Sequence, residues 1–170
     1  MIRSILLLAA IAPLMLAGPA LAEDLAKPSG RVILTVSGNI DQTNTPDSTA
    51  EFDLAMLDAL PQTRFETSTI WTDGTAEYSG VELSTLLEAV EADGTQLLMT
   101  ALNDYAIEVP ASEAVSGGPI LATRVDGKPL SVRDKGPIWV IYPFDDNEAY
   151  KTEVTYSRSI WQLKSIEVED

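Results

Sequence analysis

The sequence predicts a single α+β domain, built from mixed sheets of short strands with few helices. Short runs of alternating or β-branched apolar residues recur along the chain between turn residues, which is typical of strands. Only residues 81–92 space their apolar side chains as one helix face does, and Gly94 follows as a stop signal. Residues 23–170 also have the usual size of one domain.

Each element has its own local signal. Asp53 is expected to cap a short helix over residues 54–59, and Pro61 ends it. Asn103-Asp104 is a turn signal between two strands, and Asp126-Gly127 is a hairpin signal. Loops are expected at residues 38–48 and 143–152. The expected strands cover residues 31–36, 64–70, 96–101, 105–109, 120–125, 128–132, 138–142 and 160–168.

The first residues have the pattern of a secretory signal peptide. Arg3 precedes an apolar run over residues 5–16, and Ala20-Leu21-Ala22 is a small-x-small cleavage site. The run is shorter than the roughly 20 residues of a membrane span; an uncleaved anchor is the alternative. We expect cleavage after Ala22 and a periplasmic protein without direct membrane insertion. Residues 23–30 would then be a flexible lead-in, and residues 31–170 the domain.

Composition excludes several function classes. The chain has no cysteine and no histidine, and 11 Lys+Arg stand against 26 Asp+Glu, a formal charge of −15. No disulfide forms, no thiolate or imidazole is present to hold a metal, and Ser-His-Asp or Cys-His catalysis is impossible. The acidic balance disfavours nucleic acid as a partner. Carboxylate chemistry, a non-covalent ligand site and a protein-binding role stay open.

Four segments, residues 70–74, 101–110, 131–143 and 156–163, each join a polar or charged group to an aromatic side chain. Such groups suit a flat, nitrogen-rich heterocycle. A carboxylate accepts two neighbouring N–H groups, an amide donates and accepts, an indole or guanidinium stacks, and an ammonium binds an oxygen. Asp104 is the candidate carboxylate and Asn103 the candidate amide. The candidate binding residues are Trp71, Asn103, Asp104, Tyr105, Arg133, Lys135, Arg158 and Trp161.

Each candidate has a purely structural alternative. Asn103-Asp104 also reads as an ordinary turn. Trp139 lies inside an apolar strand and is assigned to the core, and the same alternative holds for Trp161. Asp134, between Arg133 and Lys135, also fits a surface ion pair of little energetic worth.

As a set and in this order, several motifs resemble the molybdopterin-binding domain of the sulfite oxidase family. They are GVELSTLLEAV at residues 80–90, the ALNDY segment, residues 125–143 and residues 159–169. Tyr78-Ser79-Gly80 is the segment that resembles the turn before the family's helix. Lys135-Gly136-Pro137 resembles the family's turn of a basic residue, Gly, any residue and Pro. The resemblance implies a sulfite oxidase-like fold over most of residues 31–170.

The sequence departs from that family where its enzymes bind metal. The resemblance places their molybdenum-ligating cysteine before the helix, where this chain reads ETSTIWTDG, and Lys135 stands where histidine is usual. We therefore expect no oxygen-atom transfer and no catalytic residue. The chain is more similar to secreted bacterial proteins that lack this cysteine. They bind free reduced pterins and signal to a membrane-bound partner that controls cyclic-di-GMP turnover.

This resemblance implies a reduced pterin of the dihydroneopterin or monapterin type as ligand, and it disfavours molybdopterin. It implies the periplasmic domain of a membrane diguanylate cyclase/phosphodiesterase or sensor kinase as partner. One alternative is a molybdopterin-dependent oxidoreductase or its accessory subunit. Another is a structural or protein-binding domain whose pocket is filled by side chains.

Overall fold

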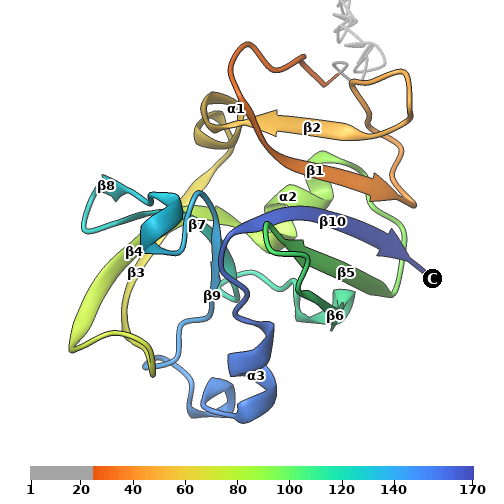
Figure 1. Cartoon of the computed structure of the whole chain (residues 1–170). Coiled ribbons are helices and arrows are strands. Elements are labelled where there is room, and N and C mark those ends of the chain that lie inside the picture. Colours follow the sequence, from red (N-terminus) through yellow and green to blue (C-terminus); the bar gives the residue numbers. More distant parts are fainter. Residues whose placement is uncertain (1–24) are drawn as a thin grey trace, which may run out of the picture.

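The computed structural model describes residues 25–170, which form two sheets and three short helices (Figure 1). The expected α+β class, with mixed sheets of short strands, is confirmed. The predicted signal peptide, residues 1–22, lies outside the described residues. The strands are β1 (Val32–Gly38), β2 (Ala50–Asp53), β3 (Gln62–Ser68), β4 (Thr75–Glu82), β5 (Gln96–Ala101), β6 (Ala106–Pro110), β7 (Ile120–Val125), β8 (Lys128–Pro129), β9 (Trp139–Ile141) and β10 (Leu163–Glu169).

The helices are few and short, as expected. They are α1 (Leu54–Ala59), α2 (Leu83–Ala89) and α3 (Glu153–Arg158), with single 3₁₀ turns η1 (Ala111–Glu113), η2 (Val132–Asp134) and η3 (Glu148–Tyr150).

The first sheet has the strand order β2-β1-β10-β5-β6, and β10 lies at its centre. β1 and β10 are parallel, while the other neighbours are antiparallel. The second sheet has the order β3-β4-β7-β8, and β9 also pairs with β7; all of these pairs are antiparallel. In Figure 1 the first sheet lies to the right and the second to the left.

The main core lies between the two sheets and includes α2. Alternation along β1 and β5 places Leu34 and Met99 in this core, fully buried. Leu83 and Leu86 of α2 and Val140 of β9 complete it from the other side. A second, smaller core within the β4–β7–β9 sheet contains the buried Tyr78 and Trp139 side chains, so the assignment of Trp139 to the core is confirmed.

A short irregular segment, residues 159–163, joins the two sheets; it contains Gln162 with φ of 55° and ends at Leu163, the first residue of β10. The Val140 amide donates to the Ile160 carbonyl at 2.9 Å, and the Leu163 amide donates to the Ile138 carbonyl at 3.0 Å. On the side of the first sheet, the Leu102 amide donates to the Gln162 carbonyl at 2.9 Å. We call residues 159–163 the junction segment.

The predicted helix over residues 81–92 is too long, and the strand before it was missed. Val81 and Glu82 belong to β4, where they pair with Leu121 and Ile120 of β7. The predicted turn at Tyr78-Ser79-Gly80 is also wrong, since these residues lie within β4. Gly80 is needed for another reason: a Cβ there would lie 2.0 Å from the Leu121 carbonyl oxygen, so glycine lets the strands pair closely.

Gly94 is not the helix stop. The helix ends at Ala89, and Glu91 takes the left-handed conformation with φ of 49°. Gly94 serves instead as a point of close approach, because a Cβ there would lie 2.4 Å from the Glu169 carbonyl oxygen.

Asp53 caps α1 as predicted, and it also holds the segment before β1. Its Oδ1 accepts from the Met56 amide at 2.9 Å, while Oδ2 accepts from the Ser29 amide at 2.9 Å and the Gly30 amide at 2.6 Å. Leu25 packs against the main core. Within the lead-in, Ser29 and Gly30 therefore bond to Asp53 and Leu25 packs on the core.

Replacing Asp53 with Ala should lower the free energy of unfolding near neutral pH. Hydrogen bonds from the Met56 and Gly30 amides hold the pKa of Asp53 below its ordinary value of 3.8. A carboxyl with a lowered folded-state pKa contributes stability above 3.8, and this is lost as the pH falls through the folded-state value. Urea unfolding should show a difference from wild type that shrinks below pH 3.8. A pH-independent difference would contradict this account; Asp47→Ala, in an exposed loop, is the control.

Candidate functional site

An open cavity of about 440 Å³ lies where the two sheets meet α3. The loop between β3 and β4 supplies Ile70 and Trp71, and the turn between β5 and β6 supplies Asn103 and Tyr105. The junction segment contributes Trp161. Elements from both sheets therefore build one hollow, and its volume is in the range of about 300–1,000 Å³ that is usual for small-molecule sites.

Four aromatic side chains, Trp71, Tyr105, Tyr156 and Trp161, line the cavity, and Trp71 is the centre of a larger cluster of rings. The Trp71 ring centroid lies 5.9 Å from that of Trp139, 5.8 Å from Trp161, 5.8 Å from Tyr156 and 6.4 Å from Phe144, all edge to face. Edge-to-face pairs are a favoured aromatic geometry and hold each ring in a defined plane. The Trp71 ring, and with it one wall of the cavity, is thus held by its neighbours.

The cavity has few polar side chains, and Asn103, Ser157 and Ser159 among them already make hydrogen bonds within the protein. Asn103 Oδ1 accepts from the Tyr105 amide at 3.2 Å, which leaves the Asn103 side-chain NH₂ for a ligand. Ser157 Oγ donates to the Val154 carbonyl, and Ser159 Oγ donates to the Thr155 carbonyl. The residues that line the described cavity carry no formal charge. The wall therefore suits a flat, uncharged ring with a small number of hydrogen-bonding groups.

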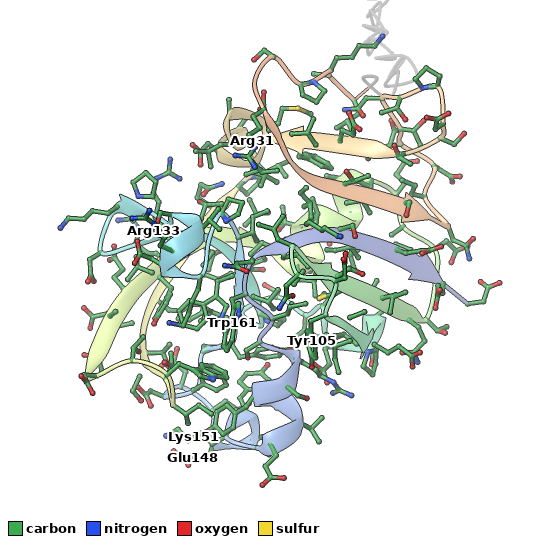
Figure 2. The ribbon with its side chains drawn as sticks, viewed as in Figure 1. Arg31, Tyr105, Arg133, Glu148, Lys151 and Trp161 are labelled. Atoms are coloured by element: carbon green, nitrogen blue, oxygen red, sulfur yellow. The ribbon has the colours of Figure 1, made fainter. Side chains whose placement is uncertain are left out.

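The candidate residues separate into two groups. Trp71, Asn103, Tyr105 and Trp161 line the cavity together, as the sequence segments suggested. Trp161 is 38% exposed, so it is not a core residue in the sense of Trp139, which is 2% exposed. Figure 2 shows Trp161 and Tyr105 near the middle of the molecule, and Arg133 away from them beside β8.

The other four candidates do not line the cavity. Asp104 sits in the turn with φ of 64°, and its largely exposed carboxylate pairs with Lys164, whose hydrogen bond and charge lower the pKa of Asp104. Arg133 is exposed on η2. The Lys135 ammonium lies over the indoles of Trp139 and Trp161, 5.2 and 5.9 Å from their centroids, which is cation–π geometry.

Arg158 is held in an ion pair that fixes α3, one wall of the cavity. Its guanidinium binds Glu113 of η1, and the same carboxylate accepts from the Tyr142 hydroxyl at 2.7 Å. Burial, together with this hydrogen bond to a carboxylate, raises the pKa of Tyr142 well above its ordinary value. Arg158 therefore positions α3 in this structure, whereas the sequence suggested that it stacks on a ligand.

Sequence reasoning missed the contribution of α3, which brings Tyr156 and Ser157 to the cavity. A signal was present: Thr152 precedes the helix and its Oγ1 accepts from the Thr155 amide at 3.2 Å, as an N-cap does. Ile70 and Ile160 were also missed, because an isolated apolar residue in a loop or strand carries no distinctive pattern.

The site does not fit a metal held by protein ligands. Within residues 25–170 no group of three or more Cys, His, Asp or Glu side chains is placed to hold an ion, and the chain has no cysteine. Trp71 lies in the segment that reads ETSTIWTDG, and this segment offers a ring to the cavity instead of a thiolate. The arrangement can bind a flat ring but supplies no protein sulfur to molybdenum.

Comparison with known proteins gives the family. The profile of the oxidoreductase molybdopterin binding domain matches residues 50–145, more than half of the chain. The chain therefore belongs to the oxidoreductase molybdopterin binding domain family. The cavity loop around Trp71 and the β5–β6 turn both lie inside the matched region. No protein with a curated description matches the chain.

A similar solved structure is that of the sulfane dehydrogenase SoxCD from Paracoccus pantotrophus. The TM-score is 0.59 at 17% sequence identity, and the match covers 81% of this chain but 38% of that chain. The chain thus spans well under half of that protein's length, and the likeness shows the fold. Among the described residues, no helix has the length and apolar character needed to cross a membrane.

Replacing Glu113 with Ala should destabilise the domain by about 1–3 kcal/mol, because it leaves the half-buried Arg158 and the buried Tyr142 hydroxyl without their acceptor. Urea unfolding measures this. Glu148→Ala is the control: its carboxylate is 82% exposed in a surface pair with Lys151, so the expected change is within about 0.5 kcal/mol. Equal effects of the two variants would contradict a structural role for Glu113.

Proposed function

We propose that the domain binds a reduced pterin in the aromatic cavity, without molybdenum, and performs no catalysis. The observation that carries this proposal is a preformed cavity of four aromatic side chains, Trp71, Tyr105, Tyr156 and Trp161, in a family that binds a pterin-containing cofactor. A pterin is a flat heterocycle with ring faces and polar edges. The cavity offers matching ring planes and the free Asn103 amide.

The remaining candidates take part only at the rim. Lys135 is the group for an oxygen on the pterin side chain, since its ammonium lies over Trp161. Asp104 accepts the pterin amino group and ring N–H only after it leaves Lys164. Arg133 and Arg158 are not needed for the core of this proposal, because neither lines the cavity.

We further propose that the protein works in the periplasm and relays pterin levels to a membrane-bound diguanylate cyclase/phosphodiesterase or sensor kinase. The leader pattern of residues 1–22 supports the location. The resemblance of the RDKGPIW and SIWQL segments to cysteine-lacking pterin regulators supports the signalling role.

Replacing Trp161 with Ala should weaken binding of 7,8-dihydroneopterin by about 1–3 kcal/mol, roughly 5- to 150-fold in Kd, because a stacking plane is lost. Isothermal titration calorimetry measures this. Val115→Ala is a matched control, since Val115 is 45% exposed and apolar but does not line the cavity. The absence of both binding heat and a Tm shift with wild type at high micromolar ligand would refute the pterin proposal.

A second candidate function is a molybdopterin-dependent oxidoreductase or its accessory subunit, and the family match favours it. The missing thiolate counts against it, because molybdenum then has no cysteine ligand. A purely structural domain with a filled pocket is less well supported, since the cavity is open.

Metal analysis separates the two ligand-binding candidates. Protein purified from its native host should contain no stoichiometric molybdenum if the pterin proposal holds. One molybdenum per chain, measured by inductively coupled plasma mass spectrometry, would favour the oxidoreductase instead.

A further inference from the structure

The loop that carries Trp71 is tied at its start to a distant carboxylate. Asp145 Oδ2 accepts from the Ser68 amide at 2.6 Å, and Asp145 Oδ1 accepts from the Ser68 hydroxyl at 2.8 Å. The Asp145 amide in turn donates to Thr67 Oγ1 at 3.1 Å. Three hydrogen bonds therefore join Asp145 to the last two residues of β3, which are 77 and 78 positions away in sequence.

These bonds act on a strand with a free edge. β3 is the outermost strand of its sheet, and among the described strands it pairs only with β4. The Ser68 amide donates to Asp145, so a carboxylate takes the place that a further strand's carbonyl would have. The same bonds keep the pKa of Asp145 below its ordinary value, so the carboxylate is charged at neutral pH.

Ser68 lies directly before the loop, and hydrogen bonds inside the loop link the next residue, Thr69, to Trp71 and Thr72. The Trp71 amide donates to Thr69 Oγ1 at 3.1 Å, and the Thr69 and Thr72 hydroxyls lie 2.7 Å apart. The loop is thus bonded internally, and Asp145 fixes Ser68, the residue from which the loop starts. Trp71 is the ring that contacts both cavity aromatics Tyr156 and Trp161.

From this geometry we propose that Asp145 is a positioning residue: acting through Ser68, it fixes the loop that places the Trp71 ring in the cavity wall. Asp145 does not line the cavity and would touch no ligand. The ligand-binding consequence of this inference rests on the proposed function, but the positioning of Trp71 does not.

Lys151 provides a control within the same cluster. Its ammonium lies 3.3 Å from Asp145 Oδ1 and 2.6 Å from Glu148 Oε1, and Figure 2 shows Lys151 and Glu148 side by side at the end of the molecule next to α3. Lys151 makes no hydrogen bond with Ser68 in the described structure. Lys151→Gln therefore removes the charge partner of Asp145 but leaves its bonds to β3.

The test compares Asp145→Ala with Lys151→Gln. The Ala side chain removes both oxygens that accept from the Ser68 amide and hydroxyl, and it leaves the backbone amide of residue 145 for Thr67 Oγ1. Ser68→Ala, which removes only the hydroxyl, and Ser68→Thr, which keeps it, form a milder pair that decides the question if Asp145→Ala does not fold.

The first readout is acrylamide quenching of the ligand-free protein in a Trp161→Phe background. The chain has three tryptophans, so Trp71 and Trp139 remain in this background. Because Trp139 is buried, an increase in the quenching constant reports greater exposure of Trp71. Asp145→Ala and Ser68→Ala should raise the quenching constant, whereas Lys151→Gln and Ser68→Thr should leave it unchanged. Unchanged quenching in both Asp145→Ala and Ser68→Ala, or an equal rise in Lys151→Gln, would overturn the inference.

The second readout is titration of each variant, with native Trp161, by 7,8-dihydroneopterin. Asp145→Ala should weaken binding by about tenfold, because a misplaced binding group loses much of its contribution, while Lys151→Gln binds as wild type does. Full affinity in Asp145→Ala would also count against the positioning role. If wild type itself does not bind this pterin, the proposed function fails and the quenching comparison alone decides the role of Asp145.

Discussion

The junction segment, residues 159–163, is the constraint on which the cavity depends. It has hydrogen bonds to both sheets: Val140 and Ile138 on one side, Leu102 on the other. The buried Trp139 indole N–H also donates to the Ser159 carbonyl at 3.1 Å. Because backbone bonds of this kind fix main-chain position closely, the two sheets cannot separate without breaking them. The space that they leave beside Trp161 is therefore a permanent feature of the fold.

The aromatic cluster turns this space into a site with defined planes. Trp71 contacts four other rings edge to face, so each indole is held by its neighbours. Preorganised rings bind a flat ligand with little loss of side-chain freedom. The family match covers residues 50–145, which include the cavity residues Trp71, Asn103 and Tyr105, while the chain has no cysteine. This combination motivates a binding role without the metal.

Local signals in the sequence predicted the fold well where neighbours along the chain decide the structure. Asp53 and Pro61 gave the bounds of α1, and Asn103-Asp104 and Asp126-Gly127 gave their turns. The predictions failed where pairing with a strand distant in sequence decides the structure. Gly80 resembled a turn residue, but it is a glycine because β7 passes close to it.

The candidate site shows the same division. The sequence segments grouped Trp71, Asn103, Tyr105 and Trp161, and all four line the cavity. The sequence could not show that Arg158 and Asp104 have ion-pair partners 45 and 60 positions away, because ion pairs between distant residues leave no local pattern. Asp145, in a segment expected to be a plain polar loop, was overlooked for the same reason.

The central place of β10 in the first sheet has a consequence for how the chain folds. β1 is made early and β10 follows every other described strand, yet the two pair directly and in parallel. Until β10 has been synthesised, β1 and β5 each present an unpaired edge, which is a template for association with other chains. Pairings between such distant residues also slow folding. The unfinished chain therefore exposes two strand edges that β10 covers in the finished domain.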